Sequence, residues 1–197
     1  MIPADFSSAA FPVCAAILAA DKEVTVHGLD FHDTQGDKKV FTILSNMGAD
    51  LRVEGPRLIV RRAERLHGIR ADLSATPDAL PILAVVGCVA EGKTILENVA
   101  MARIKETDRI AVMCEELSKM GADIEEMPDG LIIRKSELHG AIVNGHGDHR
   151  VVMALAVAGL IAKGVTQIKG AEAIRITYPT FIQSMQAIGA RMELHEG

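Results

Sequence analysis

The most constraining feature of this chain is one pattern that recurs three times along it. Each copy has an Ala-rich apolar run, a turn, a short β-branched segment and an amphipathic stretch that ends in Gly-Ala. The apolar runs cover 15–20, 84–90 and 154–162, and the Gly-Ala pairs are 48–49, 121–122 and 189–190. Such self-similarity predicts repeated structural units, which we place at about 5–62, 72–135 and 140–197.

Each unit is expected to run strand, helix, strand, helix and hairpin (βαβαββ). The Ala-rich runs predict helices of about three turns that are buried on most sides, because small side chains let neighbouring helices approach closely. The amphipathic stretches predict second helices, each ending at a Gly in the left-handed conformation. We expect the second helices at 38–47, 108–120 and 179–188, and the last strand of the third unit at 192–194.

The Ala-rich helices are too apolar to face water, so we expect them to pack around a common centre with the sheets outside. The chain is then one α/β domain over residues 1–197, with internal pseudo-threefold symmetry. An ordinary α+β domain, in which the Gly-Ala pairs arise by chance, is the alternative.

The composition favours a cytoplasmic protein that binds neither nucleic acid nor membrane. A net charge of -5, a single Tyr and no Trp argue against nucleic acid, which attracts cations and stacks on aromatic rings. The apolar stretches 81–90 and 151–162 are too short or too rich in Ala and Gly to predict membrane spans. Cys14, Cys88 and Cys114 stand in apolar contexts, so we interpret them as core residues and not as disulfide or metal ligands.

A first cluster of charge lies at the start of the second helix of unit 2. Asp108 or Thr107 can cap that helix, and its free backbone N–H groups then lie beside Arg103, Lys105 and Arg109. This arrangement suits an anion. The alternative is an ordinary capped helix with solvated cations.

A second cluster precedes the apolar helix of unit 3. Gly147 permits close backbone approach, Asp148 can cap the helix, and His149 and Arg150 offer two donors to an anionic ligand. A capped helix with a surface imidazole is the alternative. A metal site at His146 and His149 is disfavoured, because no Cys or pair of carboxylates converges nearby in the sequence.

Asp78 occupies the corresponding place in unit 2, and by position alone it is a helix cap. The segment around it and the runs 105–109 and 148–150, in this order on repeated βαβαββ units, resemble the EPSP synthase family of enolpyruvyl transferases. The run 105–109 is highly specific to that family. Segments 5–9 and 35–37 also resemble its pattern, so the resemblance spans nearly the whole chain.

The resemblance implies an enzyme that joins phosphoenolpyruvate to the 5-hydroxyl of shikimate 3-phosphate and releases phosphate, in a cleft between two three-unit domains. This chain resembles the domain built mostly from the C-terminal half. Its expected partner is the N-terminal domain, without which we expect no activity. No cofactor or metal ion is expected. Two alternatives remain: a UDP-N-acetylglucosamine enolpyruvyl transferase, which the run 105–109 disfavours, and a non-catalytic anion-binding module of the same fold.

For the binding residues, the resemblance implies that Lys105 contacts shikimate 3-phosphate. It implies that Arg109 and Arg150 clamp phosphoenolpyruvate, with His149 beside them. Planar guanidinium groups suit this role, because they bind carboxylate and phosphate groups through two parallel hydrogen bonds.

The resemblance implies that Asp78 and Glu106 carry out proton transfer. Addition to phosphoenolpyruvate needs one group to protonate its methylene carbon and another to accept the proton of the attacking hydroxyl. The chain departs from the family at Ile176, where many members have Lys. Arg175 precedes it, and a strand period of two would point Arg175 to the opposite face, which leaves that cationic role unassigned.

Overall fold

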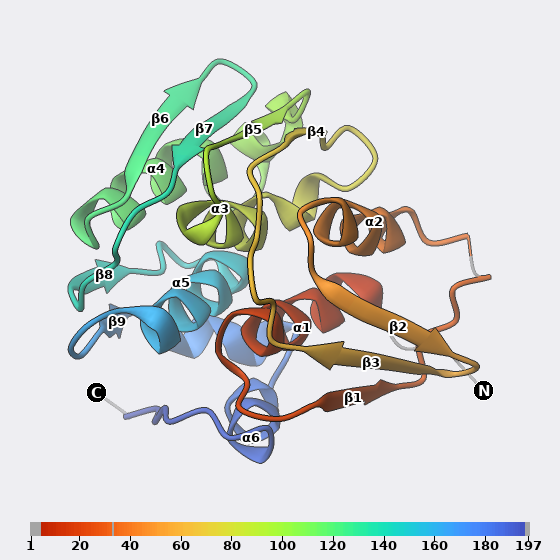
Figure 1. Cartoon of the computed structure of the whole chain (residues 1–197). Helices are drawn as coiled ribbons and strands as arrows, with labels where there is room; N and C mark the ends of the chain where they lie inside the picture. The colour runs from red at the N-terminus through yellow and green to blue at the C-terminus, as the bar shows by residue number, and fades with distance from the viewer. Residues whose placement is uncertain (1–4, 33, 196–197) are drawn as a thin grey trace.

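Three apolar helices form the centre of the molecule. The computed structural model describes residues 5–32 and 34–195, and in it α1 (Phe6–Ala19), α3 (Leu80–Val89) and α5 (His149–Ile161) pack against one another, as Figure 1 shows. The predicted arrangement of helices inside and sheets outside is confirmed. Each helix belongs to a different repeat, so the core joins all three units.

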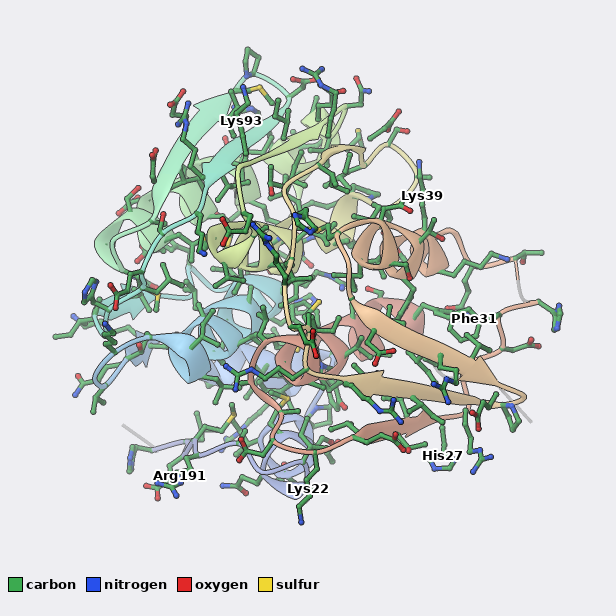
Figure 2. All side chains as sticks on the ribbon, viewed as in Figure 1. Lys22, His27, Phe31, Lys39, Lys93 and Arg191 are labelled. Atoms are coloured by element: carbon green, nitrogen blue, oxygen red, sulfur yellow. The ribbon has the colours of Figure 1, made fainter. Side chains whose placement is uncertain are left out.

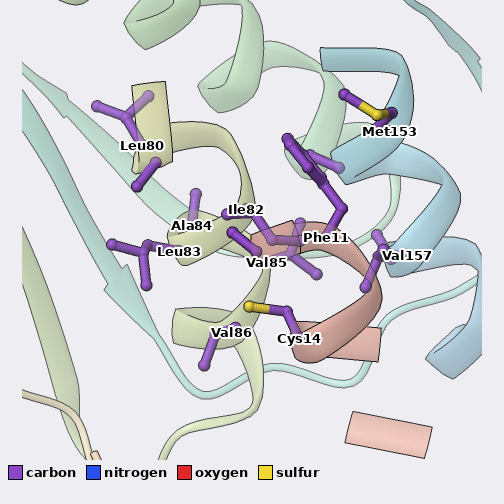
Figure 3. Close-up of a cluster of buried hydrophobic side chains, with 14 of the residues drawn as sticks. Phe11, Cys14, Leu80, Ile82, Leu83, Ala84, Val85, Val86, Met153 and Val157 are labelled. Carbon is purple, nitrogen blue, oxygen red and sulfur yellow. The ribbon is translucent and has the colours of Figure 1, made fainter. Parts of the chain in front are cut away.

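The core between these helices is made of side chains with almost no exposed surface. Phe11 of α1, Val85 of α3 and Val157 of α5 are each fully buried and lie close together in Figure 3. Cys14 and Cys88 are buried free thiols, as predicted. Burial raises the pKa of Cys88 to about 12, so this thiol stays protonated and behaves as a small apolar residue.

Three sheets surround the helices. The first has the order β1-β3-β2 and is antiparallel, the second has the order β4-β5-β7-β6 with β4 and β5 parallel, and the third is the parallel pair β8-β9. The strands are β1 (Val24–His27), β2 (Asp50–Glu54), β3 (Arg57–Arg61), β4 (Arg70–Asp72), β5 (Lys93–Glu97), β6 (Asp123–Met127), β7 (Gly130–Arg134), β8 (Ile142–Asn144) and β9 (Gln167–Lys169). Charged side chains, including Lys93 of β5 and Lys22 and Arg191 outside the strands, are exposed at the periphery (Figure 2).

A second helix follows in each repeat and ends as predicted. These helices are α2 (Lys39–Asn46), α4 (Arg109–Lys119) and α6 (Phe181–Ala187). Gly48, Gly121 and Gly189 follow them with φ of 98°, 91° and 98°, a conformation that is strained for residues with a Cβ. Short 3₁₀ helices precede α2, α3, α4 and α6: η1 (Gly36–Lys38), η2 (Pro77–Ala79), η3 (Ala100–Ile104) and η4 (Ala171–Ile176).

Two expectations for the third repeat are wrong. Residues 192–194 form no strand, so within the described residues the third sheet keeps only β8 and β9. Arg175 and Ile176 lie in η4 and not in a strand, so the strand period of two does not apply to them. Over the described ranges, no helix has the length and apolar character needed to span a bilayer.

Candidate active site

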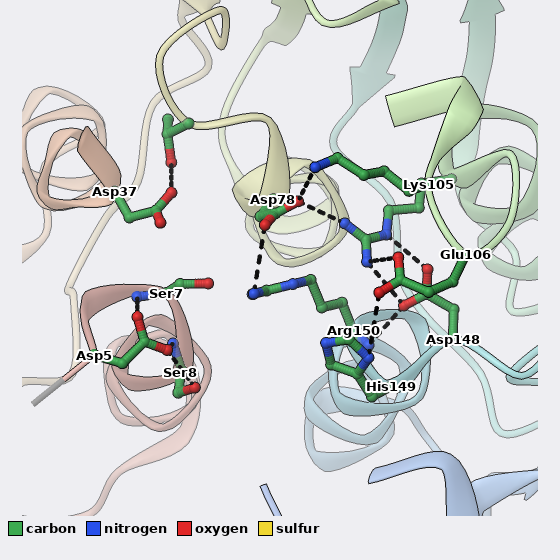
Figure 4. Close-up of polar contacts among 12 residues, drawn as sticks. Asp5, Ser7, Ser8, Asp37, Asp78, Lys105, Glu106, Asp148, His149 and Arg150 are labelled. Atoms are coloured by element: carbon green, nitrogen blue, oxygen red, sulfur yellow. Dashed lines mark hydrogen bonds and ion pairs between the residues drawn. The ribbon is translucent and has the colours of Figure 1, made fainter. Parts of the chain in front are cut away.

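Arg109 lies at the centre of a cluster at the starts of α3, α4 and α5, where its guanidinium bonds to three carboxylates. Figure 4 labels those carboxylates, Asp78, Glu106 and Asp148. Arg109 is the first residue of α4, and only 1% of its surface is exposed. Its Nε donates to Asp148 Oδ2 at 2.7 Å, its Nη1 to Asp78 Oδ1 at 2.8 Å and its Nη2 to Glu106 Oε2 at 2.7 Å. One guanidinium therefore joins carboxylates from the second and third repeats.

Asp148 has two structural tasks at this junction. It is fully buried, and its Oδ1 accepts from the backbone N–H of Arg150 at 2.8 Å and of Val151 at 3.4 Å, so it caps α5 as predicted. The same carboxylate holds Arg109 through two hydrogen bonds. The ion pair across 39 residues was not predicted, because nothing in the local sequence distinguishes a cap that also binds a distant Arg.

Asp78 is not the helix cap that its position suggests. It lies in η2, and Ala79 stands at the start of α3 with no side-chain cap. Its carboxylate instead lies 3.2 Å from Lys105 Nζ and 3.5 Å from Arg150 Nη2, in addition to its bond with Arg109. Burial on its own would raise the pKa of Asp78, but the charges of Arg150, Arg109 and Lys105 outweigh it and lower the pKa. Asp78 is therefore ionised at neutral pH.

His149 is buried and not a surface imidazole. Only 4% of the residue is exposed, its Nε2 has no hydrogen-bond partner among residues 5–32 and 34–195, and its Nδ1 lies 3.8 Å from Glu106 Oε1. Burial, followed by the charge of Arg150, lowers the pKa of His149, so the ring is neutral at neutral pH. A buried ring nitrogen without a partner is unusual and is a ready contact for a ligand.

The charged groups of the cluster differ in how accessible they are. The side chains of Lys105 and Glu106 are 30% and 47% exposed, that of Arg150 is 14% exposed, and Arg109 lies beneath them. Arg103 does not join the cluster, because its Nη1 and Nη2 pair at 2.8 Å with Asp108 and Glu126 respectively. Asp108, one of the two predicted candidates, caps α4.

A separate group of side chains has the geometry of a metal site. Among the described residues, Glu115, Glu116 and His146 bring potential ligand atoms together. Lys119 Nζ already lies 2.8 Å from a carboxylate oxygen of each Glu, so an ammonium takes the place of a cation there. His146 faces Glu116 and not His149, so the spacing of the two His residues does not form a metal site.

The chain as a whole is similar to known proteins. A family model described as EPSP synthase (3-phosphoshikimate 1-carboxyvinyltransferase) matches residues 1–185. The chain belongs to the EPSP synthase family. Curated family members named 3-phosphoshikimate 1-carboxyvinyltransferase include one from Ruminiclostridium cellulolyticum, 50% identical over 98% of this chain and 45% of the relative. Another, from Acetivibrio thermocellus, is 53% identical over 96% of this chain and 44% of the relative.

Solved structures agree with this membership. An EPSP synthase from Acinetobacter baumannii matches with a TM-score of 0.86 and 30% identity, covering 99% of this chain and 48% of that one. The enolpyruvyl transferase NikO from Streptomyces tendae matches with a TM-score of 0.76 at 18% identity, which shows a shared fold. The chain thus spans about half the length of the EPSP synthases it matches.

Proposed function

We propose that this chain supplies one wall of an EPSP synthase active site. In that reaction the enolpyruvyl group of phosphoenolpyruvate moves to the 5-hydroxyl of shikimate 3-phosphate and phosphate is released. The observation that carries the proposal is the cluster around Arg109, which brings Asp78, Lys105, Glu106 and Arg150 within one network of hydrogen bonds and ion pairs. The names of the relatives favour this acceptor over UDP-N-acetylglucosamine.

In this proposal the accessible cations bind the substrates. Lys105 and Arg150 lie 3.2 and 3.5 Å from Asp78, farther than Arg109 at 2.8 Å. A substrate anion can therefore take the place of Asp78 as the partner of Lys105 or Arg150 at a lower cost in free energy than at Arg109. Lys105 then contacts shikimate 3-phosphate, and Arg150 with the unpartnered Nε2 of His149 contacts phosphoenolpyruvate. Arg109 reaches phosphoenolpyruvate only after Asp78 or Glu106 releases part of its guanidinium.

The two accessible carboxylates, Asp78 and Glu106, are proposed to move protons. Asp78 is ionised and can accept the proton of the attacking hydroxyl. Glu106 is the most exposed carboxyl of the cluster. In its protonated form it can donate a proton to the methylene carbon of phosphoenolpyruvate during addition, and its carboxylate can take a proton back from that carbon when phosphate leaves. The cations held beside them would stabilise the charge of the tetrahedral adduct and of the departing phosphate.

We further propose that turnover requires the rest of the enzyme, with this chain acting as a single domain beside an N-terminal one. The cluster lies on the surface of one compact body, and its accessible groups meet solvent. A reaction with two substrates needs both of them fixed and water excluded, which a single wall does not provide. The cytoplasmic location stays a prediction from composition.

The test is reconstitution. The chain is mixed with the N-terminal half of the Ruminiclostridium cellulolyticum relative, complex formation is checked by gel filtration, and phosphate release is measured with both substrates. We expect release that depends on both substrates and disappears in the Asp78→Asn, Glu106→Gln double variant. A complex that forms but releases no phosphate would contradict the proposed reaction. Phosphate release by the chain alone would contradict the need for a partner.

A further inference from the structure

Glu116 is a buried carboxylate that the proposed reaction does not use. It lies on α4 seven residues after Arg109, about two helical turns, so both side chains leave the same side of the helix. Glu116 is fully buried, and its Oε2 accepts the backbone N–H of Asn144 at 3.1 Å. Its Oε1 lies 2.6 Å from His146 Nε2 and 2.8 Å from Lys119 Nζ.

These contacts hold the turn 144–148, which leads into α5. Asn144 Oδ1 accepts the backbone N–H of His146 at 2.8 Å, and the N–H of Asp148 donates to the carbonyl of Gly145 at 2.9 Å. His146 has a φ of 50°, a left-handed conformation that is unfavourable for a residue with a side chain. Gly145 has no room for a side chain, because a Cβ there would lie 2.2 Å from Val152 Cγ2. The turn is therefore strained and close-packed, and it needs contacts that hold it.

The turn is held at both ends by α4. Glu116 holds Asn144 and His146 at its start, and Arg109 holds Asp148 at its end. The next two residues are His149 and Arg150, whose directions are set by where α5 begins. A displacement of the turn would therefore move both of these side chains together.

We propose that Glu116 is a positioning residue that, through His146, fixes the turn 144–148 and thereby orients Asp148, His149 and Arg150 in the cluster. The importance of this orientation for catalysis rests on the proposed function, but the positioning itself does not. Burial on its own would raise the pKa of Glu116, but hydrogen bonds from Lys119, His146 and Asn144 lower it, so the carboxylate is charged at neutral pH. A charged acceptor strengthens each of these bonds.

The proposal is tested on the full 197-residue chain by amide hydrogen exchange and NMR titration. Glu116→Ala is compared with Glu115→Ala, a neighbouring variant that also loses a contact with Lys119 but whose side chain is 57% exposed. We expect the amides of Asn144, Arg150 and Val151 to exchange about tenfold faster or more in Glu116→Ala, because Asn144 loses its acceptor and the other two donate to Asp148, which the turn holds. Amides of the second sheet should be unchanged, as should all amides in Glu115→Ala.

A second measurement is the titration midpoint of His149, a residue that neither Glu116→Ala nor Glu115→Ala replaces. Its ring faces Glu106, Asp148, Arg109 and Arg150. If the turn loosens, the ring gains solvent, and its titration midpoint should move up toward the ordinary His value in Glu116→Ala and stay unchanged in Glu115→Ala. A purely stabilising role for Glu116 would leave this midpoint where it is.

A double variant tests the route through His146. His146→Asn removes the ring but keeps a residue that tolerates positive φ. If Glu116 acts through His146, the variant with both changes should exchange no faster than Glu116→Ala alone. Fully additive effects of the two changes on the exchange rates would show that Glu116 does not act through His146.

Unchanged exchange at 144–151 in Glu116→Ala would overturn the proposal, and so would acceleration spread evenly over the chain. If Glu116→Ala does not fold, the same exchange measurement is made on Glu116→Gln, because this variant keeps an acceptor for Asn144 but loses the charge. Faster exchange confined to 146–151 supports the proposal, and unchanged exchange overturns it. None of these measurements involves turnover, so the proposal and the proposed function can fail separately.

Discussion

Asp78 and Asp148 occupy equivalent places in the second and third repeats, yet they do different work. Each precedes the apolar central helix of its unit, and each binds Arg109. Asp148 is fully buried and caps its helix through two backbone N–H groups. Asp78 caps nothing, and 26% of its side chain is exposed beside Lys105 and Arg150.

The difference teaches how a repeated fold acquires a site. The same position supplies a carboxylate fixed by burial and capping in one unit, and a carboxylate free to change partners in another. Asp5, at the third such position, caps α1 through Ser7 and Ser8 and lies at the exposed end of the helix. We infer that Asp148 has a structural role and that Asp78 is available for chemistry.

The largest effect should come from Asp148→Ala. This change leaves the guanidinium of Arg109 buried with one carboxylate fewer and removes the cap of α5, so we expect the free energy of unfolding to fall by about 3–5 kcal/mol. Urea denaturation monitored by circular dichroism measures it. The exposed Asp21→Ala is the control and should change stability by less than about 0.5 kcal/mol. A loss from Asp148→Ala that is no larger than the control would refute the fixed role.

Acidification should weaken the fold in two stages. The pKa of His149 is lowered by burial and by Arg150, so the unfolded chain binds its proton more readily and stability falls as the pH drops below about 6.5. The second stage comes from Asp78 and Glu116, whose pKa values are lowered from 3.8 and 4.5 in the folded chain. Their contributions to the free energy of unfolding are complete at a pH above those ordinary values, and they are lost as the pH falls through the lowered pKa values.

Unfolding midpoints measured from pH 8 to pH 3 resolve the two stages. His149→Gln should remove the first stage and leave the second. Asp78→Asn and Glu116→Gln should each diminish the second. If the first stage persisted unchanged in His149→Gln, its assignment to this ring would be wrong.

Asp5→Ala should have a smaller effect than Asp148→Ala, because Asp5 caps a helix without holding a buried cation. Its Oδ1 and Oδ2 accept from the N–H groups of Ser7 at 3.1 Å and Ser8 at 2.9 Å. Loss of a cap of this kind costs about 1 kcal/mol. Asp5→Asn keeps an acceptor and should be close to neutral. A loss equal to that of Asp148→Ala would erase the contrast between the two caps.

The central helices and the turns after the second helices were predicted correctly because they depend on local patterns. Apolar runs, Gly residues after helices and Asp before helices act over a few residues, so α1, α3, α5 and the turns at Gly48, Gly121 and Gly189 were found. The error at Asp78 has a local cause too: Pro77 begins a 3₁₀ turn, which moves the start of α3 beyond the reach of that carboxylate.

Other features could not be read locally. The bonds of Arg109 to Asp78 and Asp148 span 31 and 39 residues, and the contact of Glu116 with His146 spans 30, so they exist only once the repeats have packed. The one available signal was the spacing of Arg109 and Glu116, which places both on one side of α4. This spacing indicates that the two side chains point the same way but does not identify the residues that they contact.

The most direct test of the contrast compares Asp78→Asn with Asp148→Asn in both unfolding and reconstituted turnover. Asp78→Asn should change the free energy of unfolding by no more than about 1 kcal/mol, because its carboxylate is partly exposed, but lower turnover by roughly 100-fold or more. Asp148→Asn should destabilise the chain more than Asp78→Asn does. Full turnover in Asp78→Asn, or equal destabilisation by the two variants, would contradict the division between a structural and a chemical carboxylate.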